Sequence, residues 1–183
     1  MCIDKRGNIL FTLKEVEEVY PFSEGRALVA IIDKDGESKY GFVDEKGKMV
    51  ISPQYDKANS FSEGMAAVYL NDRWGFIDKS GKVVIQPQFV RASDFHEGKA
   101  SIYDGKHYGF IDKNGIYSIA PQFDWVSDYK SGMACFRQGN MYGYLDKKGS
   151  ITINPQFENA DDFSGNLAKY MMNKKRRNSH FAG

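Results

Sequence analysis

Short stretches rich in apolar, β-branched and aromatic residues follow one another along the chain, separated by Gly, Asn and Asp. Three successive stretches are residues 65–70 (MAAVYL), 73–78 (RWGFID) and 82–86 (KVVIQ), named here strand a, strand b and strand c. Alternation along strand b puts Trp74 and Phe76 on one face and Gly75 and Ile77 on the other, as in a β-strand. The two-residue link Asn71-Asp72 favours a tight hairpin between strands a and b. Asp78 and Gly81 suit the first and last positions of a turn between strands b and c.

The same pattern recurs at a constant interval of 34 residues. Several independent markers keep this register, so we conclude that the chain is built from tandem repeats. The markers are Pro-Gln at Pro53, Pro87, Pro121 and Pro155; the aromatic-Gly-aromatic steps at 40–42, 74–76, 108–110 and 142–144; the Asp-x-x-Gly steps that begin at Asp44, Asp78, Asp112 and Asp146, with a divergent one at Asp4; and single alanines at Ala27, Ala66, Ala100, Ala134 and Ala168.

A period of 34 also occurs in helical tetratricopeptide arrays, so residue chemistry has to decide the fold. Each copy carries glycines, a proline and many β-branched or aromatic residues, which disfavour a helix interior. The array is therefore predicted to be β. Pro87 is expected to end strand c, because proline lacks the donor that a ladder needs. Residues 88–95 space Phe89, Ala92 and Phe95 by three, which predicts a 3₁₀-like turn under the sheet.

One unit is thus a three-stranded antiparallel meander with a packed link. Such a small sheet cannot bury its apolar face alone, so neighbouring units are expected to stack, with Ala100 and its counterparts at the contact. The fold class is all-β, a tandem array in an open stack, with a five-bladed propeller-like closure as the alternative. The predicted domain spans residues 1–172, with units at about 1–39, 40–73, 74–107, 108–141 and 142–172, and residues 173–183 form a basic tail.

The repeat resembles the WG repeat, also called the KWG repeat, which is found mostly in bacterial proteins. Residues 72–89 carry the motif, with Trp74, Gly75, Asp78, Gly81 and Pro87 at its defining positions, and Ala100 follows. Tyrosine replaces the Trp in the other three clear copies, and the first copy lacks Pro-Gln. The resemblance covers almost the whole chain. It implies an array of β units with an interaction role and brings no catalytic residues.

Positions where the copies differ are the candidates for specific binding. The first copy is five residues longer than the others, and the surplus lies in residues 32–39, a charged loop with Asp33, Asp35 and Glu37. A tolerated surface insertion is the alternative interpretation. Trp125 stands where the sister copies have Lys57, Arg91 and Asn159. An exposed Trp there would anchor a partner, whereas packing under the link is the alternative.

Two histidines, His96 and His107, are also specific to one copy and are candidate binding residues. No third ligand recurs near them, so we predict no metal and no cofactor. The tail contains Lys174, Lys175, Arg176 and Arg177, which could bind nucleic acid or anionic lipid but is more typical of a solvated terminus. No other nucleic-acid binding is expected, because the chain's net charge is only +1.

Composition narrows the function classes further. No apolar run approaches the length of a membrane span, and residues 1–7 lack the apolar core of a signal peptide, which favours the cytoplasm. No phosphate-binding loop or Gly-x-Ser-x-Gly motif occurs, the repeated Asp is expected to form turns, and Cys135 is expected to be buried. We therefore expect no enzymatic activity.

The favoured hypothesis is a binding or scaffold module that presents a repetitive β surface to a protein partner. One alternative is binding of a glycan or cell-wall ligand through exposed aromatic residues. A second alternative is an accessory or targeting segment for a separate enzyme.

Overall fold

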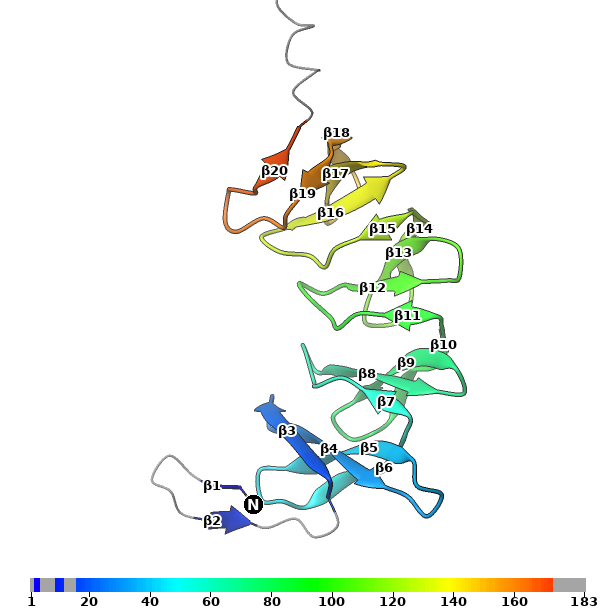
Figure 1. Ribbon diagram of the computed structural model, residues 1–183, viewed down its shortest axis with the longest axis vertical. Helices are drawn as coiled ribbons and strands as arrows, with labels where there is room; N and C mark the ends of the chain where they lie inside the picture. The colour runs from blue at the N-terminus through cyan, green and yellow to red at the C-terminus, as the bar shows by residue number, and fades with distance from the viewer. Residues whose placement is uncertain (1, 4–8, 12–15, 173–183) are drawn as a thin grey trace, which may run out of the picture. The chain divides into compact units, whose positions relative to one another are not determined.

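The structure, a computed structural model, describes residues 2–3, 9–11 and 16–172 (Figure 1). All regular elements in these residues are β-strands, paired antiparallel, which confirms the all-β prediction, and no sheet among them closes into a barrel. The chain divides into two compact units, Met1–Asp94 and Phe95–Gly183, and each is described by itself.

The first unit contains a two-stranded sheet of β1 and β2 and two four-stranded sheets. The four-stranded sheets run in the orders β3-β4-β5-β6 and β7-β8-β9-β10, so that every neighbour in a sheet is also a neighbour in sequence. The strands are β1 (Cys2–Ile3), β2 (Ile9–Phe11), β3 (Glu18–Ser23), β4 (Arg26–Ile32), β5 (Ser38–Asp44), β6 (Met49–Tyr55), β7 (Lys57–Ala58), β8 (Met65–Leu70), β9 (Arg73–Asp78), β10 (Val83–Phe89) and β11 (Arg91–Ala92).

The second unit repeats the same meander. Strands β12, β13 and β14 pair in sequence order, β15-β16-β17-β18 is a four-stranded sheet, and β19 pairs with β20. The strands are β12 (Ala100–Tyr103), β13 (Tyr108–Ile111), β14 (Tyr117–Phe123), β15 (Trp125–Val126), β16 (Met133–Gln138), β17 (Met141–Asp146), β18 (Ile151–Phe157), β19 (Asn159–Ala160) and β20 (Tyr170–Met171).

Strands a and b form with the predicted bounds, as β8 and β9 show. Asn71 and Asp72 both have positive φ, 51° and 61°, as the tight hairpin turn requires. Asp78 Oδ1 accepts hydrogen bonds from the backbone N–H groups of Ser80 and Lys82, at 2.8 and 3.1 Å. Gly81 follows with φ 89°. The Asp-x-x-Gly step is therefore a turn former, as predicted.

The prediction of a 3₁₀-like link was wrong. The link contains a two-residue strand that pairs with the next strand a, for example Lys57 with Tyr69 and Ala58 with Val68. We call it the link strand. The residues after it take an irregular path that buries an aromatic side chain, such as Phe61, which is 2% exposed. Each meander thereby gains a fourth strand, because pairing satisfies backbone groups that a turn would leave to solvent.

Pro87 does not end strand c, which was also predicted wrongly. β10 continues to Phe89, with register shifts between Val83 and Ile85 and between Ile85 and Phe89. Proline is tolerated there because an irregular stretch of the ladder needs no N–H donor. The strand crosses close over Gly75, where an added Cβ would lie 2.5 Å from Ile85 O and 2.6 Å from Pro87 N. Gly75 and Pro87 therefore form one interlocked feature.

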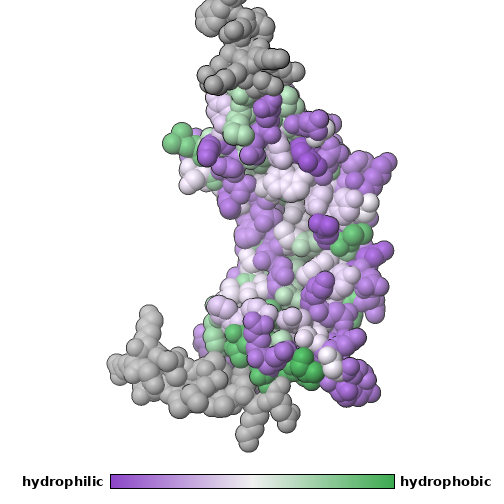
Figure 2. All heavy atoms as spheres, viewed as in Figure 1, coloured by the Kyte–Doolittle hydropathy of each residue, from purple (hydrophilic) through white to green (hydrophobic). Residues whose placement is uncertain are grey.

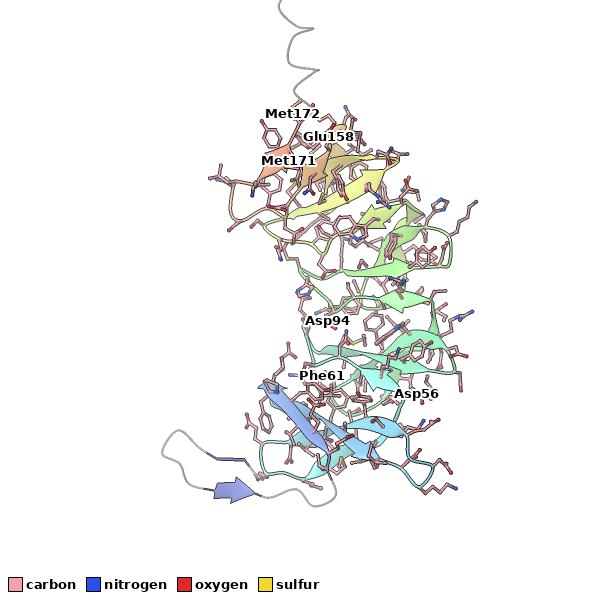
Figure 3. The ribbon with its side chains drawn as sticks, in the orientation of Figure 1. Asp56, Phe61, Asp94, Glu158, Met171 and Met172 are labelled. Atoms are coloured by element: carbon pink, nitrogen blue, oxygen red, sulfur yellow. The ribbon has the colours of Figure 1, made fainter. Side chains whose placement is uncertain are left out.

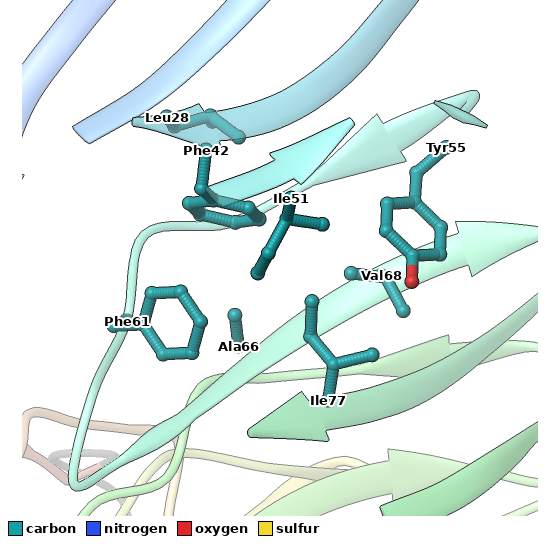
Figure 4. Close-up of a cluster of buried hydrophobic side chains, with 8 residues drawn as sticks. All are labelled: Leu28, Phe42, Ile51, Tyr55, Phe61, Ala66, Val68 and Ile77. Atoms are coloured by element: carbon teal, nitrogen blue, oxygen red, sulfur yellow. The ribbon is translucent and has the colours of Figure 1, made fainter. Parts of the chain in front are cut away.

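The hydrophobic core of the first unit lies between its two four-stranded sheets (Figure 4). Phe42 of β5 and Ile51 of β6 contribute from the first sheet, and Ala66, Val68 and Ile77 contribute from the second. The complete cluster is Leu28, Phe42, Ile51, Tyr55, Phe61, Ala66, Val68 and Ile77. Figure 3 labels Phe61 in the link beside it. The short alanine side chain lets strand a approach the preceding sheet closely.

The second unit has a core of the same construction. Its members are Phe110, Ile119, Phe123, Val126, Tyr129, Ala134, Phe136 and Leu145, which join β13 and β14 to the following repeat. The alanines at the repeat position, Ala27, Ala66, Ala100 and Ala134, are all at most 1% exposed. The predicted tail, residues 173–183, lies outside the described residues, and the open stack and the five-bladed closure stay predictions.

Candidate binding surface

A row of large side chains crosses the β7–β10 and β15–β18 sheets at the level of the aromatic residue in strand b, whereas in the β3–β6 sheet the small Ala30 stands opposite Tyr40. In the second sheet of the first unit, Lys57, Tyr69, Trp74 and Phe89 stand opposite one another on neighbouring strands. Directly opposite residues share a face of the sheet and are close enough to interact. The Tyr69 and Trp74 rings are 5.3 Å apart, and Lys57 Nζ lies 5.2 Å from the centre of the Tyr69 ring. We call such a set an aromatic row.

The row with the most exposed aromatic residue belongs to the β15–β18 sheet. Trp125, Arg137, Tyr142 and Phe157 are the opposing residues on its four strands. Trp125 is 37% exposed, and its ring contacts the edge of Tyr142 with centroids 6.0 Å apart and planes at 72°. Of the two alternatives for Trp125, exposure and packing under the link, the side chain follows the first.

Arg137 occupies the place that tyrosine takes in the sister rows, at Tyr69 and Tyr103. It stands between Trp125 and Tyr142, and its Nε is buried without a hydrogen-bond partner in the described residues. The row thus combines the three rings of Trp125, Tyr142 and Phe157 with a permanent positive charge. Trp, Tyr and Arg are the residue types most enriched at the energetic centres of protein interfaces.

Much of the surface of the protein is polar, and a polar residue adjoins Trp125. In the view of Figure 2 hydrophilic residues cover most of the surface, and hydrophobic residues appear in small separate patches. Asp124, next to Trp125, points its carboxylate back to the β16–β17 hairpin, where Gly139 N–H donates to Oδ2 at 2.6 Å. An apolar ring surrounded by polar groups is the usual composition of an interface centre with its rim.

In the charged loop of the first copy, the Asp33 side chain forms hydrogen bonds within the loop itself. Asp33 Oδ1 accepts hydrogen bonds from the backbone N–H groups of Asp35 and Glu37, at 2.9 and 3.0 Å, and these bonds hold the pKa of Asp33 below its ordinary value. Gly36 has φ 82°. The inserted segment is therefore another Asp-x-x-Gly turn. Glu37 pairs with Lys39 at 3.0 Å, and Asp35 is exposed.

The two histidines do not come together. His96 precedes β12 and faces Asp128, with 3.7 Å between Nε2 and the carboxylate, whereas His107 lies in the turn at the other end of the β12–β13 hairpin. There its backbone N–H donates to Asp104 Oδ1 at 2.8 Å. Within the described residues no three His, Cys, Asp or Glu side chains are grouped as a metal site.

Cys135 and Ser127 form a small buried polar contact in the second core. Ser127 Oγ accepts a hydrogen bond from Cys135 N at 3.0 Å, and the cysteine is 1% exposed. Burial, with a smaller contribution from Asp162 and Asp161, raises the pKa of the thiol to about 12. The thiol is therefore neutral at ordinary pH, which opposes a role as nucleophile.

Two features of this surface were missed from sequence. Arg137 was not singled out, although a comparison of the copies at the Tyr69 position would have shown the change to arginine. The apolar end of the second unit, at Phe157, Phe163 and Tyr170, was also missed, because the periodicity alone predicts those residues to be buried. In the part of the chain that the structure describes, no helix has both the length and the apolar character needed to cross a bilayer.

Comparison with protein families identifies the repeat directly. The model described as "WG containing repeat" matches residues 1–37, 40–74, 74–105, 108–142 and 142–175. A comparison with curated protein sequences finds no match. The matches follow the meanders of the structure and include Trp74, Gly75 and the row residues Tyr108 and Tyr142. The chain therefore belongs to the family of proteins built from WG-containing repeats.

Proposed function

We propose that this protein is a non-catalytic binding or scaffold module that holds a protein partner on the aromatic row of the β15–β18 sheet. The observation that carries the proposal is the exposure of Trp125, 37%, at a position where the sister repeats have Lys57, Arg91 and Asn159. A partner that covers the exposed part of this ring would remove apolar surface from water, which favours binding.

The rigidity of the site supports this assignment. Trp125 lies on a strand that is paired with β16, and Tyr142 limits the ring from the side. The side chain therefore has little rotational freedom to lose when a partner binds. Arg137, opposite Trp125 on the neighbouring strand, adds a charge that favours a partner with an acidic or polar rim around an apolar anchor.

The use of the polar groups supports a non-catalytic role. The repeated carboxylates of Asp44, Asp78 and Asp112 each accept two backbone hydrogen bonds in turns. The Cys135 thiol is buried and neutral. These groups are engaged in the fold, and an activity screen of the purified chain that detects turnover would contradict this part of the proposal.

The test uses the full chain as an immobilised bait, as the wild type and as two variants. Trp125→Asn introduces the residue of the sister position Asn159, and Lys57→Asn makes the matched change in another row. We expect a stoichiometric partner, identified by mass spectrometry, that is retained by the wild type and by Lys57→Asn and lost with Trp125→Asn. Equal retention by all three proteins would remove Trp125 from the binding site.

Glycan binding is the second candidate, because the exposed Trp125 ring beside Tyr142 also suits stacking against a sugar. A glycan array probed with the same proteins separates the two functions. Saturable binding to one glycan class that is lost with Trp125→Asn would favour the glycan. A retained partner that proves to be an enzyme would instead make the chain an accessory segment of that enzyme.

A further inference from the structure

The last repeat of the described chain is incomplete, although the strands it contains are normal. In β19 and β20, Asn159 pairs with Met171 and Ala160 with Tyr170, which is the register of Lys57 with Tyr69 and Ala58 with Val68. These are the link strand and strand a. In the complete sheets strand a is followed by strand b, yet β20 has no further neighbour among the described residues.

Among the residues that the structure describes, no strand b follows β20, and the core is open at this end. A hollow of about 220 Å³ is lined by Tyr144, Ile153, Phe157, Phe163, Asn166, Leu167, Ala168 and Tyr170. Tyr170 is 51% exposed, whereas its counterparts Val68 and Phe136 are at most 1% exposed. Figure 3 labels Met171 and Met172 at the same end, and both are exposed.

Comparison with the complete cores shows which residue is missing. Tyr144, Ile153, Phe157, Phe163, Ala168 and Tyr170 repeat the cluster of Phe42, Ile51, Tyr55, Phe61, Ala66 and Val68. The cluster of the first unit has a further member in strand b, Ile77, and that of the second unit has Leu145; both are 0% exposed. The hollow therefore lacks a branched aliphatic residue on a strand paired with β20.

The other end of the chain contains the missing half of a repeat. In β1 and β2, Cys2 pairs with Phe11 and Ile3 with Ile9, with a register shift between the two pairs. Strands b and c have the same register, as in Phe42 with Ile51 and Val43 with Met49. Ile3 precedes an Asp-x-x-Gly step, as Ile77 does. The hairpin forms a two-stranded sheet of its own, an arrangement that is only marginally stable in water.

We propose that β20 of one copy of this chain accepts the β1–β2 hairpin of a second copy, which completes the sheet in the order β19-β20-β1-β2. The docked hairpin would continue the repeat-to-repeat interface already present inside each unit, with Ile3 opposite Ala168 as Ile77 is opposite Ala66. The same contact can be made at both ends of every copy. Such a head-to-tail contact generates chains or rings of copies, and this inference does not depend on the partner proposed above.

The register predicts a cross-link. Ala67 stands opposite Phe76 in a complete sheet, so Lys169 of one copy would stand opposite Cys2 of the next. Leu70 and Arg73 close a two-residue turn and form a hydrogen-bonded pair, and pairs alternate along the ladder. Ala67 and Phe76 are consequently a non-hydrogen-bonded pair, whose short Cα separation suits a disulfide.

The experiment oxidises the full chain carrying Lys169→Cys and separates the products on a non-reducing gel. We expect a ladder of covalent multimers that disappears when Cys2→Ser is added. Ala168→Cys provides the register control, since neighbouring side chains point to opposite faces of a strand, and it should give no ladder. Absence of the ladder with Lys169→Cys, or a disulfide confined to single chains, would overturn the proposal.

Sedimentation of the unmodified protein gives an independent measurement. The wild type should sediment faster as its concentration rises, and Tyr170→Lys should remain a monomer with an unchanged thermal midpoint, because Tyr170 is half exposed in the single chain. A wild type that stays monomeric over the whole concentration range, or a Tyr170→Lys variant that associates equally well, would contradict the docking of a second copy.

Discussion

Aromatic side chains at equivalent repeat positions have different environments in the core of the first unit and at the β17–β20 end of the second. Phe42 and Phe61 have ring centroids 4.8 Å apart, and Tyr144 and Phe163 have the same separation. Phe61 is 2% exposed, whereas Phe163 is only half-buried. The difference arises from strand b, which supplies Ile77 in one place and is absent from the described residues in the other.

This comparison shows that a WG repeat is a complete sheet but only part of a core. Its backbone pairing, turns and glycines are satisfied within the meander, whereas its apolar face is buried by the next repeat. In repeat proteins the total stability is close to a sum of contributions within repeats and between neighbours. The two kinds of contribution can be separated by matched substitutions.

The largest expected effect comes from truncating the link aromatic residue. Phe61→Ala should destabilise the protein by about 3–5 kcal/mol, because it opens a cavity in a buried cluster. Phe163→Ala should destabilise by about 1 kcal/mol, since part of the ring is already in water. Denaturant titration of dilute protein measures both. Equal effects would mean that the two environments do not differ in solution.

Substitution of the glycine that strand c crosses should destabilise both regions equally, because this contact lies within one sheet. Gly75→Ala and Gly143→Ala should each destabilise by about 3 kcal/mol, because the new Cβ would lie 2.5 Å from the carbonyl oxygen of Ile85 or Ile153. Gly64→Ala is the control, where φ is 86° but no atom lies within 4 Å, and it should cost about 1 kcal/mol. Thermal and chemical unfolding of the three variants test the ranking, and a mild effect of Gly75→Ala would contradict the close crossing.

The loss of stability on enlarging the alanine that recurs at the same repeat position should also differ between the two regions. Ala134→Leu should destabilise by about 1–3 kcal/mol, because Ala134 is 1% exposed within the second core. Ala168→Leu should be tolerated in the monomer, since Ala168 borders the open hollow. Unfolding midpoints of both variants at low protein concentration make the comparison. A destabilised Ala168→Leu would show that the hollow is closed in solution.

The smallest expected effect depends on pH. Glu97 accepts a hydrogen bond from Gly132 N–H at 3.0 Å and pairs with Lys147 at 2.8 Å, and Lys147 is the main reason that the pKa of Glu97 lies below its ordinary 4.5. One repeat later Ser131 Oγ takes its place and accepts from Gly165 N–H at 3.0 Å. The Glu97 carboxylate can be protonated as the pH falls, whereas the Ser131 hydroxyl does not change its charge.

A carboxyl group whose pKa is lower in the folded than in the unfolded state stabilises the fold at pH values above its unfolded-state pKa. This stabilisation is lost as the pH falls through the folded-state pKa. Glu97→Gln should therefore lower the thermal midpoint at pH 7 and have a progressively smaller effect as the pH falls below about 4.5. Ser131→Ala should have the same effect at both pH values. A Glu97→Gln effect that is independent of pH would exclude the ionised carboxylate as its cause.

Most of the fold was predictable because its determinants are local. The turn of Asn71-Asp72, the Asp78-to-Gly81 step, the apolar run of β8 and the alternation in β9 each involve residues close in sequence. The link strand was not predictable in this way. Lys57 and Ala58 pair with residues ten or more positions later, and two residues are too few to show a period. The course of strand c beyond Pro87 likewise depends on its contact with Gly75.

The candidate surface was predictable in part. Trp125 was found because it interrupts a polar position of the repeat, and the structure leaves this residue 37% exposed, with the ring against Tyr142. The charged loop could have been recognised as a second Asp-x-x-Gly turn, since Asp33 and Gly36 carry the motif. The separation of His96 from His107 could not have been predicted from sequence, because it depends on which ends of the β12–β13 hairpin the two residues occupy.

By itself, the sequence determined the repeat, its period, the strands a and b and the turns between them, because these follow from residues that interact over short distances along the chain. Only the tertiary structure decided which apolar residues are buried. Tyr144 and Tyr170 belong to the same repeating pattern, yet Tyr144 is 2% exposed and Tyr170 is 51% exposed. Burial requires a neighbouring sheet to exclude water, and no local pattern specifies whether that neighbour is present.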